Sequence, residues 1–164
     1  MTIQAKVLAP EEGRQGWLGR LGIRFMISGE ETGGGFTLIE HVLKPRALAA
    51  PLHRHTQEDE YSFILRGRVG ARLGDKIVHG TSGDLIFKPR DQWHTFWNDG
   101  DEEASLLEII SPAGFDHYFE EMLAISPGGR PQPELAAPIR ARYGLEVDVT
   151  SVLTLVAEHN LVPG

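Results

Sequence analysis

Three side chains between Pro51 and Gly67 have the types and spacing of metal ligands. In the segment PLHRHTQEDEYSFILRG, His53 and His55 are two residues apart, and Glu60 follows five residues later. Alternate residues of a β-strand point to the same face, so a strand here projects both histidines together and turns Arg54 away. Imidazole nitrogen and carboxylate oxygen suit divalent first-row transition metals. The segment therefore predicts the first half of a metal site, which needs a fourth ligand from elsewhere.

Composition narrows the kind of protein that could hold such a site. The chain has 164 residues, no cysteine, 41% hydrophobic and 24% charged residues, which is typical of one globular domain without thiolate ligands or disulfides. A net charge of −7 and the absence of a clustered Lys/Arg stripe disfavour nucleic acid as a partner. The sequence shows neither an apolar run of the roughly 20 residues that a membrane span needs nor a signal pattern, so we expect a cytoplasmic protein with no membrane partner.

Short runs of apolar and β-branched residues recur along the chain and are separated by turn-forming residues. The runs that predict strands, besides the histidine segment, lie at residues 2–8, 21–27, 36–44, 61–65, 69–73, 76–79, 84–88, 94–98 and 104–110. Because no helical pattern lies between the later runs, we expect an antiparallel barrel or sandwich. In residues 36–44, His41 shares a face with Ile39 and Leu43, which points it either into a barrel interior or into a hydrogen-bonded core or surface position.

The pattern changes to helical spacing after Pro112. Residues 114–125 predict a helix whose apolar stripe holds Phe115, Tyr118, Phe119, Met122 and Leu123, and shorter helices are predicted at residues 133–143 and 150–158. We expect residues 1–112 to form the barrel and residues 113–164 to form a helical appendix packed on it, within one structural domain, because about fifty residues of short helices bury little surface alone. The aromatic stripe either packs the core or covers the barrel mouth.

A second segment, GDLIFKPRDQWHTFWN at residues 83–98, supplies a fourth donor. His94 follows a proline-containing turn, and pairing across a barrel would bring its imidazole beside the first segment. Phe96 shares the face of His94 and is expected to line the cavity. Trp93 and Trp97 alternate with them and are expected to point outward, into a subunit contact or the helical appendix.

Together the two segments resemble the two sequence motifs of the cupin family. The first motif runs Gly, five residues, His-x-His, three or four residues, Glu, six residues, Gly, and the second runs Gly, five residues, Pro-x-Gly, two residues, His, three residues, Asn. The positions that match are His53, His55, Glu60 and Gly67, then Gly83, Pro89, His94 and Asn98. Fifteen residues separate Gly67 from Gly83, as in compact microbial cupins. Ala47 and Asp91 replace two family glycines that serve turns.

The resemblance covers about residues 36–110 and implies a mostly β cupin-type antiparallel barrel, a double-stranded β-helix or jelly roll. It implies one divalent transition-metal ion (Fe, Mn, Ni, Co, Cu or Zn) bound by His53, His55, Glu60 and His94. Glu58 and Asp59 are interpreted as solvated loop charges, because spacing and strand parity favour Glu60 as the carboxylate ligand. Ser62 and Ile64 share the face of Glu60, and Ile64 is therefore a pocket candidate.

The segment Ser111 to Phe115 and the aromatic helix after it resemble the C-terminal part of small bacterial quercetinase-like cupins. This implies a dioxygenase acting, with dioxygen, on a small cyclic or aromatic enol such as a flavonol. Glu60 would then be catalytic, as the base that takes the substrate's hydroxyl proton. The expected pocket residues are His41, Ile64, Phe96, Phe115, Tyr118, Phe119 and Met122.

Two other functions fit the same ligands. A non-oxidative isomerase or lyase acting on a small sugar or keto acid would use the metal as a Lewis acid and needs a further acid or base, for which His41 and Tyr118 are the candidates. A binding protein without catalysis is the third interpretation. The family also implies a homodimer formed through outer sheet faces.

Overall fold

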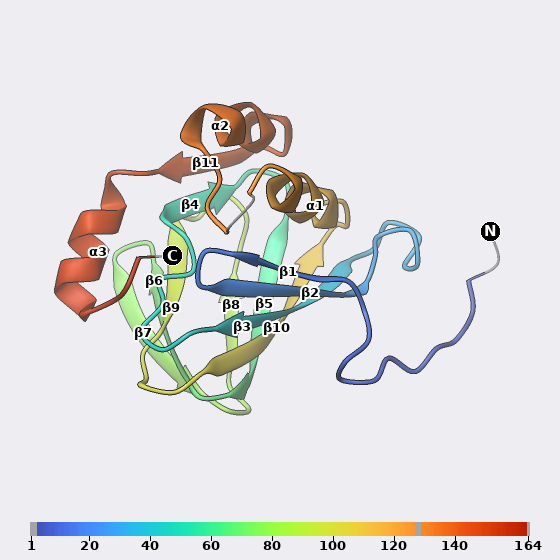
Figure 1. Cartoon of the computed structure of the whole chain (residues 1–164), viewed down its shortest axis with the longest axis horizontal. Helices are drawn as coiled ribbons and strands as arrows, with labels where there is room; N and C mark the ends of the chain where they lie inside the picture. Colours follow the sequence, from blue (N-terminus) through green and yellow to red (C-terminus); the bar gives the residue numbers. More distant parts are fainter. Residues whose placement is uncertain (1–2, 127–128, 164) are drawn as a thin grey trace.

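The computed structural model describes residues 3–126 and 129–163, and its strands form two antiparallel sheets (Figure 1). The first sheet has the order β1-β2-β3-β10-β5-β8, with the bounds Gln15–Leu18, Leu21–Ile27, Thr37–Leu43, Ala104–Ser111, Asp59–Arg66 and Leu85–Lys88. The second has the order β11-β4-β9-β6-β7, with the bounds Leu145–Asp148, Leu52–His55, His94–Asn98, Arg68–Leu73 and Lys76–Thr81. Strands distant in sequence are therefore neighbours, which brings the two histidine segments together.

Strand alternation decides which side chains enter the core between the sheets. In β3 the residues Thr37, Ile39, His41 and Leu43 are buried, and the residues between them are only partly buried. This confirms the predicted division of the strand into two faces. In β9 all five residues are buried, because its inner face meets the core and its outer face is covered by the C-terminal segment.

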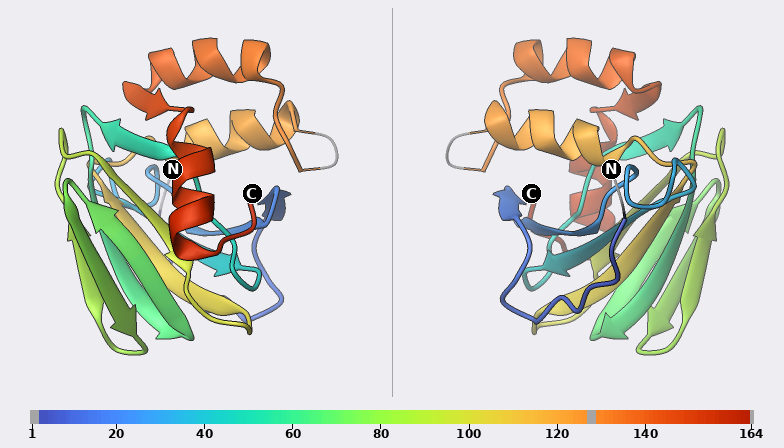
Figure 2. Two further views of the ribbon diagram at one scale, coloured as in Figure 1. Left: turned by 90° about the vertical axis from the view of Figure 1, so that its left-hand side faces the viewer. Right: turned by 90° about the vertical axis from the view of Figure 1, so that its right-hand side faces the viewer.

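The three helices α1 (Asp116–Ala124), α2 (Pro133–Arg142) and α3 (Ser151–His159) confirm the three predicted helices. Figure 2 shows α1 and α2 one above the other over one end of the sheets. Helix α3 packs on β9 through a small buried cluster that includes Leu155 and Trp97. The ring of Trp97 stacks on His159 of α3 with centroids 4.3 Å apart, so Trp97 points outward into the helical region, one of its two expected positions. None of the helices in the described part of the chain is long and apolar enough to cross a membrane.

Two predictions near the N-terminus were wrong. Residues 3–8 form no strand, since Ile3 and Val7 stay exposed and no neighbouring strand offers hydrogen bonds or a surface to bury them; Thr2 lies outside the described residues. Instead, β1 forms within the segment interpreted as a turn, and pairs with β2. Lys44 lies over the ring of Trp17 at 4.7 Å, and Trp17 packs on Gly22, which gives this short strand its anchor.

The C-terminal region also contains a strand that sequence reasoning missed. Residues 145–148 form β11, which pairs with β4 in the register Leu145 to His55 and Val147 to His53. The region after residue 112 is therefore not purely helical. It extends the sheet along the strand that carries two of the candidate ligands.

The turn positions of the second motif behave as expected. Asp91, which replaces a family glycine, has a φ of 65°, a conformation that aspartate tolerates better than most residues. In the first motif Ala47 also ends a turn, because its backbone N–H donates to the carbonyl oxygen of Lys44 at 3.1 Å. The residue with a positive φ there is Arg46, at 56°, and Ala47 itself is fully buried and bridges to Val162.

The outer face of β5 and β8 exposes several large apolar side chains. Phe63, Leu65, Leu85 and Phe87 are between 39% and 57% exposed. Phe63 lies opposite Leu85 across the strand pair, so these side chains form one patch at the edge of the first sheet. A contiguous apolar patch is typical of an interaction surface.

We propose this patch as the contact face of the expected homodimer. Replacing Leu85 and Phe87 together by Lys should convert a dimer to a monomer, because the charges would be buried without partners. Light scattering coupled to size-exclusion chromatography measures the mass. Ile77→Lys, an exposed site on the other sheet, is the control and should leave the mass unchanged; a wild-type chain that runs as a monomer would contradict the proposal.

Candidate metal centre

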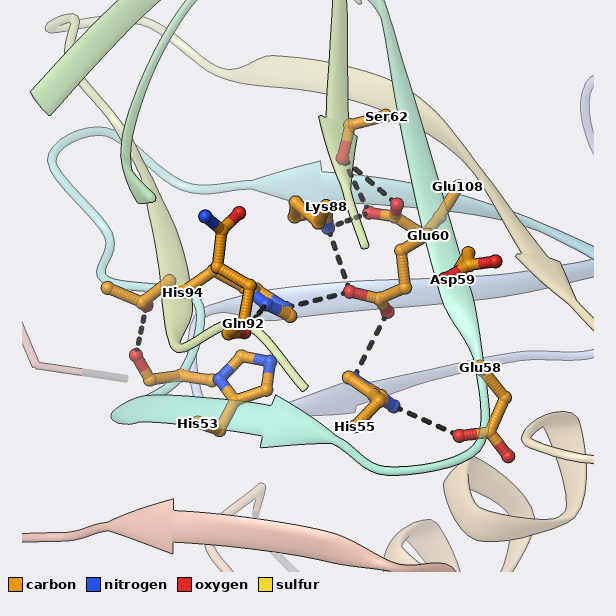
Figure 3. Close-up of polar contacts among 12 residues, drawn as sticks. His53, His55, Glu58, Asp59, Glu60, Ser62, Lys88, Gln92, His94 and Glu108 are labelled. Carbon is orange, nitrogen blue, oxygen red and sulfur yellow. Dashed lines mark hydrogen bonds and ion pairs between the residues drawn. The ribbon is translucent and has the colours of Figure 1, made fainter. Parts of the chain in front are cut away.

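The four residues predicted as ligands converge inside the barrel (Figure 3). One donor atom from each of His53, His55, Glu60 and His94 lies within 4.8 Å of the others, and all four side chains are buried. Strand β4 supplies the first two and β5 supplies Glu60. The pairing of β4 with β9 places His53 directly opposite His94, which explains how residues 41 positions apart reach one point.

Hydrogen bonds orient two of the imidazoles so that Nε2 faces the centre. His53 Nδ1 lies 2.7 Å from the carbonyl oxygen of Pro51, and His94 Nδ1 lies 3.0 Å from that of Gln92. A carbonyl oxygen only accepts, so each Nδ1 carries a proton, and Nε2 is the atom of each ring that would bind a metal. Burial lowers the pKa of both histidines, which keeps them in the neutral form that binds metal.

His55 has a carboxylate as its outer partner, and this corrects the interpretation of Glu58 as a solvated loop charge. Glu58 is 5% exposed, and its Oε2 lies 3.5 Å from His55 Nδ1. Both atoms are buried without a hydrogen-bond partner among the described residues, so a small approach would make the missing bond. The geometry fits a histidine that binds metal through Nε2 and donates Nδ1–H to a carboxylate.

Asp59 is also not a loop charge. It begins β5 and its carboxylate accepts hydrogen bonds from the backbone and guanidinium of Arg90, the shortest at 2.8 Å. These bonds from Arg90 lower the pKa of Asp59. Because strand alternation turns Asp59 away from the centre, it joins β5 to the turn before His94 and does not compete with Glu60.

Three neighbouring side chains hold the carboxylate of Glu60 in place. Its Oε2 lies 2.9 Å from His94 Nε2 and 3.1 Å from Lys88 Nζ, and its Oε1 lies 3.4 Å from His55 Nε2. Burial opposes ionisation of Glu60, but the charges of His55 and Lys88 and the bond to His94 outweigh it and hold the pKa well below its usual range. Glu60 is therefore a carboxylate ready to bind a cation.

Behind Glu60 lies a polar network that sequence reasoning missed. Lys88 Nζ donates to Glu108 Oε2 at 3.0 Å, and the Ser62 hydroxyl lies 3.0 and 2.9 Å from the two oxygens of Glu108. All three side chains are buried. Lys88 in LIFK and Glu108 in ASLLEIIS both stand at positions whose side chains point into the core. A charged residue at such a position was the signal in the sequence that could have revealed this network.

The charge of this cluster fits a divalent cation. Glu58, Glu60 and Glu108 are buried carboxylates, whereas Lys88 is the one buried ammonium group in the described part of the chain. In this cluster buried carboxyl groups thus outnumber buried ammonium groups by three to one, and a divalent ion would balance this excess of acidic groups. Three imidazole nitrogens and one carboxylate form a donor set that transition metals accept, so the residues present fit the metal.

Beside the four residues lies a cavity of about 290 Å³. Of the predicted pocket residues, those that line it are His41, Phe96, Phe115, Tyr118, Phe119 and Met122. Ile64 is not among the described residues that line the cavity. Its side chain is fully buried in the core and points toward Gly80 of β7. Lining residues that were not predicted include Glu108, Arg140 and, from β11, Leu145 and Val147.

His41 is both hydrogen-bonded in the core and directed into the barrel interior, the two alternatives that its sequence context left open. Its Nδ1 lies 3.1 Å from the carbonyl oxygen of Gly22, while the ring contacts Phe96 and Phe119 in the cavity wall. Burial lowers the pKa of His41 to about 4. It is therefore neutral near pH 7, donates to Gly22 and keeps a lone pair on Nε2.

Comparison with known proteins supports the fold and the family. Residues 39–110 match the model of the cupin domain, a range that includes every candidate ligand. The chain contains a cupin domain. No curated protein matches this chain.

Solved structures share the cupin fold at low sequence identity. KdgF from a Halomonas species is 12% identical with a TM-score of 0.61, and the match covers 70% of this chain and 99% of that one. A predicted oxalate decarboxylase from Thermotoga maritima is 22% identical with a TM-score of 0.60, covering 65% and 99%. A cupin-superfamily sugar phosphate isomerase from Silicibacter pomeroyi is 18% identical with a TM-score of 0.57, covering 65% and 75%.

Metal binding should depend on His94 and, more weakly, on Glu58. His94→Ala removes a donor and should abolish binding, whereas Glu58→Ala removes the group that orients His55 and should lower affinity by about 10- to 100-fold. Elemental analysis of purified protein and competitive titration against a chelator measure these effects. Glu146→Ala, which removes a half-exposed carboxylate of β11, is the matched control and should retain wild-type affinity. Equal affinities of wild type and Glu58→Ala would contradict the role given to Glu58.

Proposed function

We propose that this cupin is a metal-dependent enzyme that catalyses a non-oxidative proton transfer, as an isomerase or lyase does, on a small hydroxy- or keto-substituted molecule. The observation that carries the proposal is Glu108, a second buried carboxylate that lines the same cavity as His53, His55 and Glu60. Sequence reasoning named His41 and Tyr118 as the acid or base for such a reaction. Glu108 is better suited.

Glu108 has the properties of a group that exchanges protons near neutral pH. Burial raises its pKa to about 7, although the charge of Lys88 opposes the shift. Ser62 and Lys88 hold its carboxylate in one orientation toward the cavity. A buried acid with such a pKa changes protonation at low cost near neutral pH, which is what general base catalysis requires.

Glu60 is less suited to the base role that the quercetinase-like resemblance implies. Its Oε2 is engaged by both His94 and Lys88, and its pKa is held well below the usual range, so it is a weak base. Two carboxylates in one cavity thus differ in environment: Glu60 is suited to binding the cation and Glu108 to moving a proton.

When bound by His53, His55, Glu60 and His94, the metal would act as a Lewis acid on a substrate oxygen. The protein's residues supply the remaining functions. Glu108 takes a proton from the carbon next to the polarised group and returns it to the product or gives it to a leaving hydroxyl. Lys88 stabilises the ionised form of Glu108. The aromatic residues Phe115 and Phe119 close the cavity against water.

The size of the cavity also supports a small substrate. At about 290 Å³ it lies at the lower end of the roughly 300–1,000 Å³ of small-molecule sites. Fold neighbours that are described as a sugar phosphate isomerase and a predicted oxalate decarboxylase act, by those descriptions, on small polar molecules. They support the proposal only as examples of what this fold accommodates.

Dioxygenase activity on an aromatic enol is the second candidate function. The observation that favours it is the aromatic wall made by Phe96, Phe115 and Phe119, against which a planar ring could pack. Oxygen uptake with a panel of flavonols and other enols distinguishes the two functions. Uptake without proton exchange on hydroxyketones would favour the dioxygenase.

Proton abstraction can be measured directly as deuterium incorporation. Metal-loaded protein should exchange the α-protons of at least one small hydroxyketone or keto acid in deuterated water, followed by NMR. Glu108→Gln should slow exchange by about 10²- to 10⁴-fold because the base is lost. Metal content should stay unchanged, and equal exchange by the variant and wild type would contradict the role of Glu108.

The pH dependence follows from the ionised form of Glu108 being the active one. The rate should rise with pH and level off near or below pH 7, since the pKa is about 7 without metal and a nearby cation lowers it. This rise should be absent in Glu108→Gln. A rate that falls as Glu108 ionises would show that its protonated form is the active one.

A further inference from the structure

One arginine on α2 faces the cavity. Ala136 and Ile139 are buried and define the inner side of the helix, and Arg140 follows Ala136 by four residues on that side. Arg140 lines the cavity together with residues of α1 and β11. The sequence predicted this helix but gave no function to its charged residues.

The guanidinium of Arg140 lacks the partners that other arginines of the region have. Its Nε is buried without a hydrogen-bond partner, and no carboxylate of residues 3–126 or 129–163 lies within 4.0 Å of its nitrogens. Arg142, two positions further, pairs with Glu121 on the outside of the helix. Although Arg140 is only partly buried, a buried N–H without a partner costs free energy unless a ligand completes it.

Tyr118 of α1 is adjacent to Arg140. Burial raises the pKa of Tyr118, and the positive charge of Arg140 and a hydrogen bond from it offset part of that rise. Tyr118 also lines the cavity, beside Phe115 and Phe119. The helix-covered part of the wall thus combines apolar rings with the guanidinium of Arg140, whereas the barrel part holds candidate ligands and Glu108. Arg130, in the segment before α2, also lines the cavity, but its Nη2 donates to the carbonyl oxygen of Pro163.

We propose that Arg140 binds a carboxylate or phosphate group of the substrate, so that the enzyme acts on small anionic molecules. A guanidinium presents parallel N–H donors that match the oxygens of either anion. Held at Arg140, the anionic group leaves the hydroxy or keto end to reach the candidate metal ligands and Glu108. The inference rests on the proposed function in taking this cavity as the substrate site.

The test uses acetate and inorganic phosphate as probes of the two anion classes, with acetamide as the neutral counterpart of acetate. Dissociation constants come from melting-temperature titrations at constant ionic strength. The reference protein, which takes the place of the wild type, carries His94→Ala so that no anion binds through the metal. Arg140→Gln, Arg140→Lys and Arg142→Gln are each added to this reference. Melting temperatures without anion verify that each variant is folded.

Arg140→Gln should weaken binding of the preferred anion by about tenfold or more, Arg140→Lys should retain part of it, and Arg142→Gln should match the reference protein. The stronger of acetate and phosphate identifies the anion class. Equal weakening by Arg140→Gln and Arg142→Gln, unchanged binding in Arg140→Gln, or equal binding of acetamide would each overturn the proposal. Anion binding that persists with His94→Ala supports Arg140 even if the enzyme proposed above shows no proton exchange.

Discussion

The arrangement of the whole site depends on the buried ammonium group of Lys88, which lies between Glu60 and Glu108. Burial alone would lower the pKa of Lys88, but the two carboxylates outweigh that effect and raise it. Removing one partner of such a buried set costs roughly 3–5 kcal/mol, so the three side chains specify one another's positions. Because Lys88 lies equally close to both carboxylates, their different pKa values come from the other neighbours: His55 and His94 favour the ionised form of Glu60, whereas burial and the charge of Glu60 raise the pKa of Glu108.

The barrel positions the ligands, and the C-terminal region determines what can reach them. Strand β11 pairs with β4, so the segment that follows α2 is hydrogen-bonded to the strand that carries His53 and His55. Helix α1 contributes aromatic residues to both the core and the cavity wall. The cavity wall and the strand of two candidate ligands are therefore joined by hydrogen bonds, although their residues lie far apart along the chain.

Periodicity was a reliable guide wherever one face of a strand is buried. The faces of β3 and the ligand strand β4 follow from alternation alone, and the three helices follow from their apolar spacing. Prediction failed for residues 3–8 because alternation without a partner strand has no burial to stabilise it. It failed for β11 because a four-residue strand is stabilised by its pairing with β4 and not by local preference.

The sequence by itself determined the candidate ligand set, since His53, His55, Glu60 and His94 stand at offsets that strand geometry and the cupin motifs both require. Only the tertiary structure decided the environment of that set. Glu108 meets Ser62 across 46 positions, Glu58 turns inward beneath His55, and Arg140 faces the cavity from a helix. Such contacts depend on sheet order and on how helices cover the barrel, and local residue spacing carries no information about either.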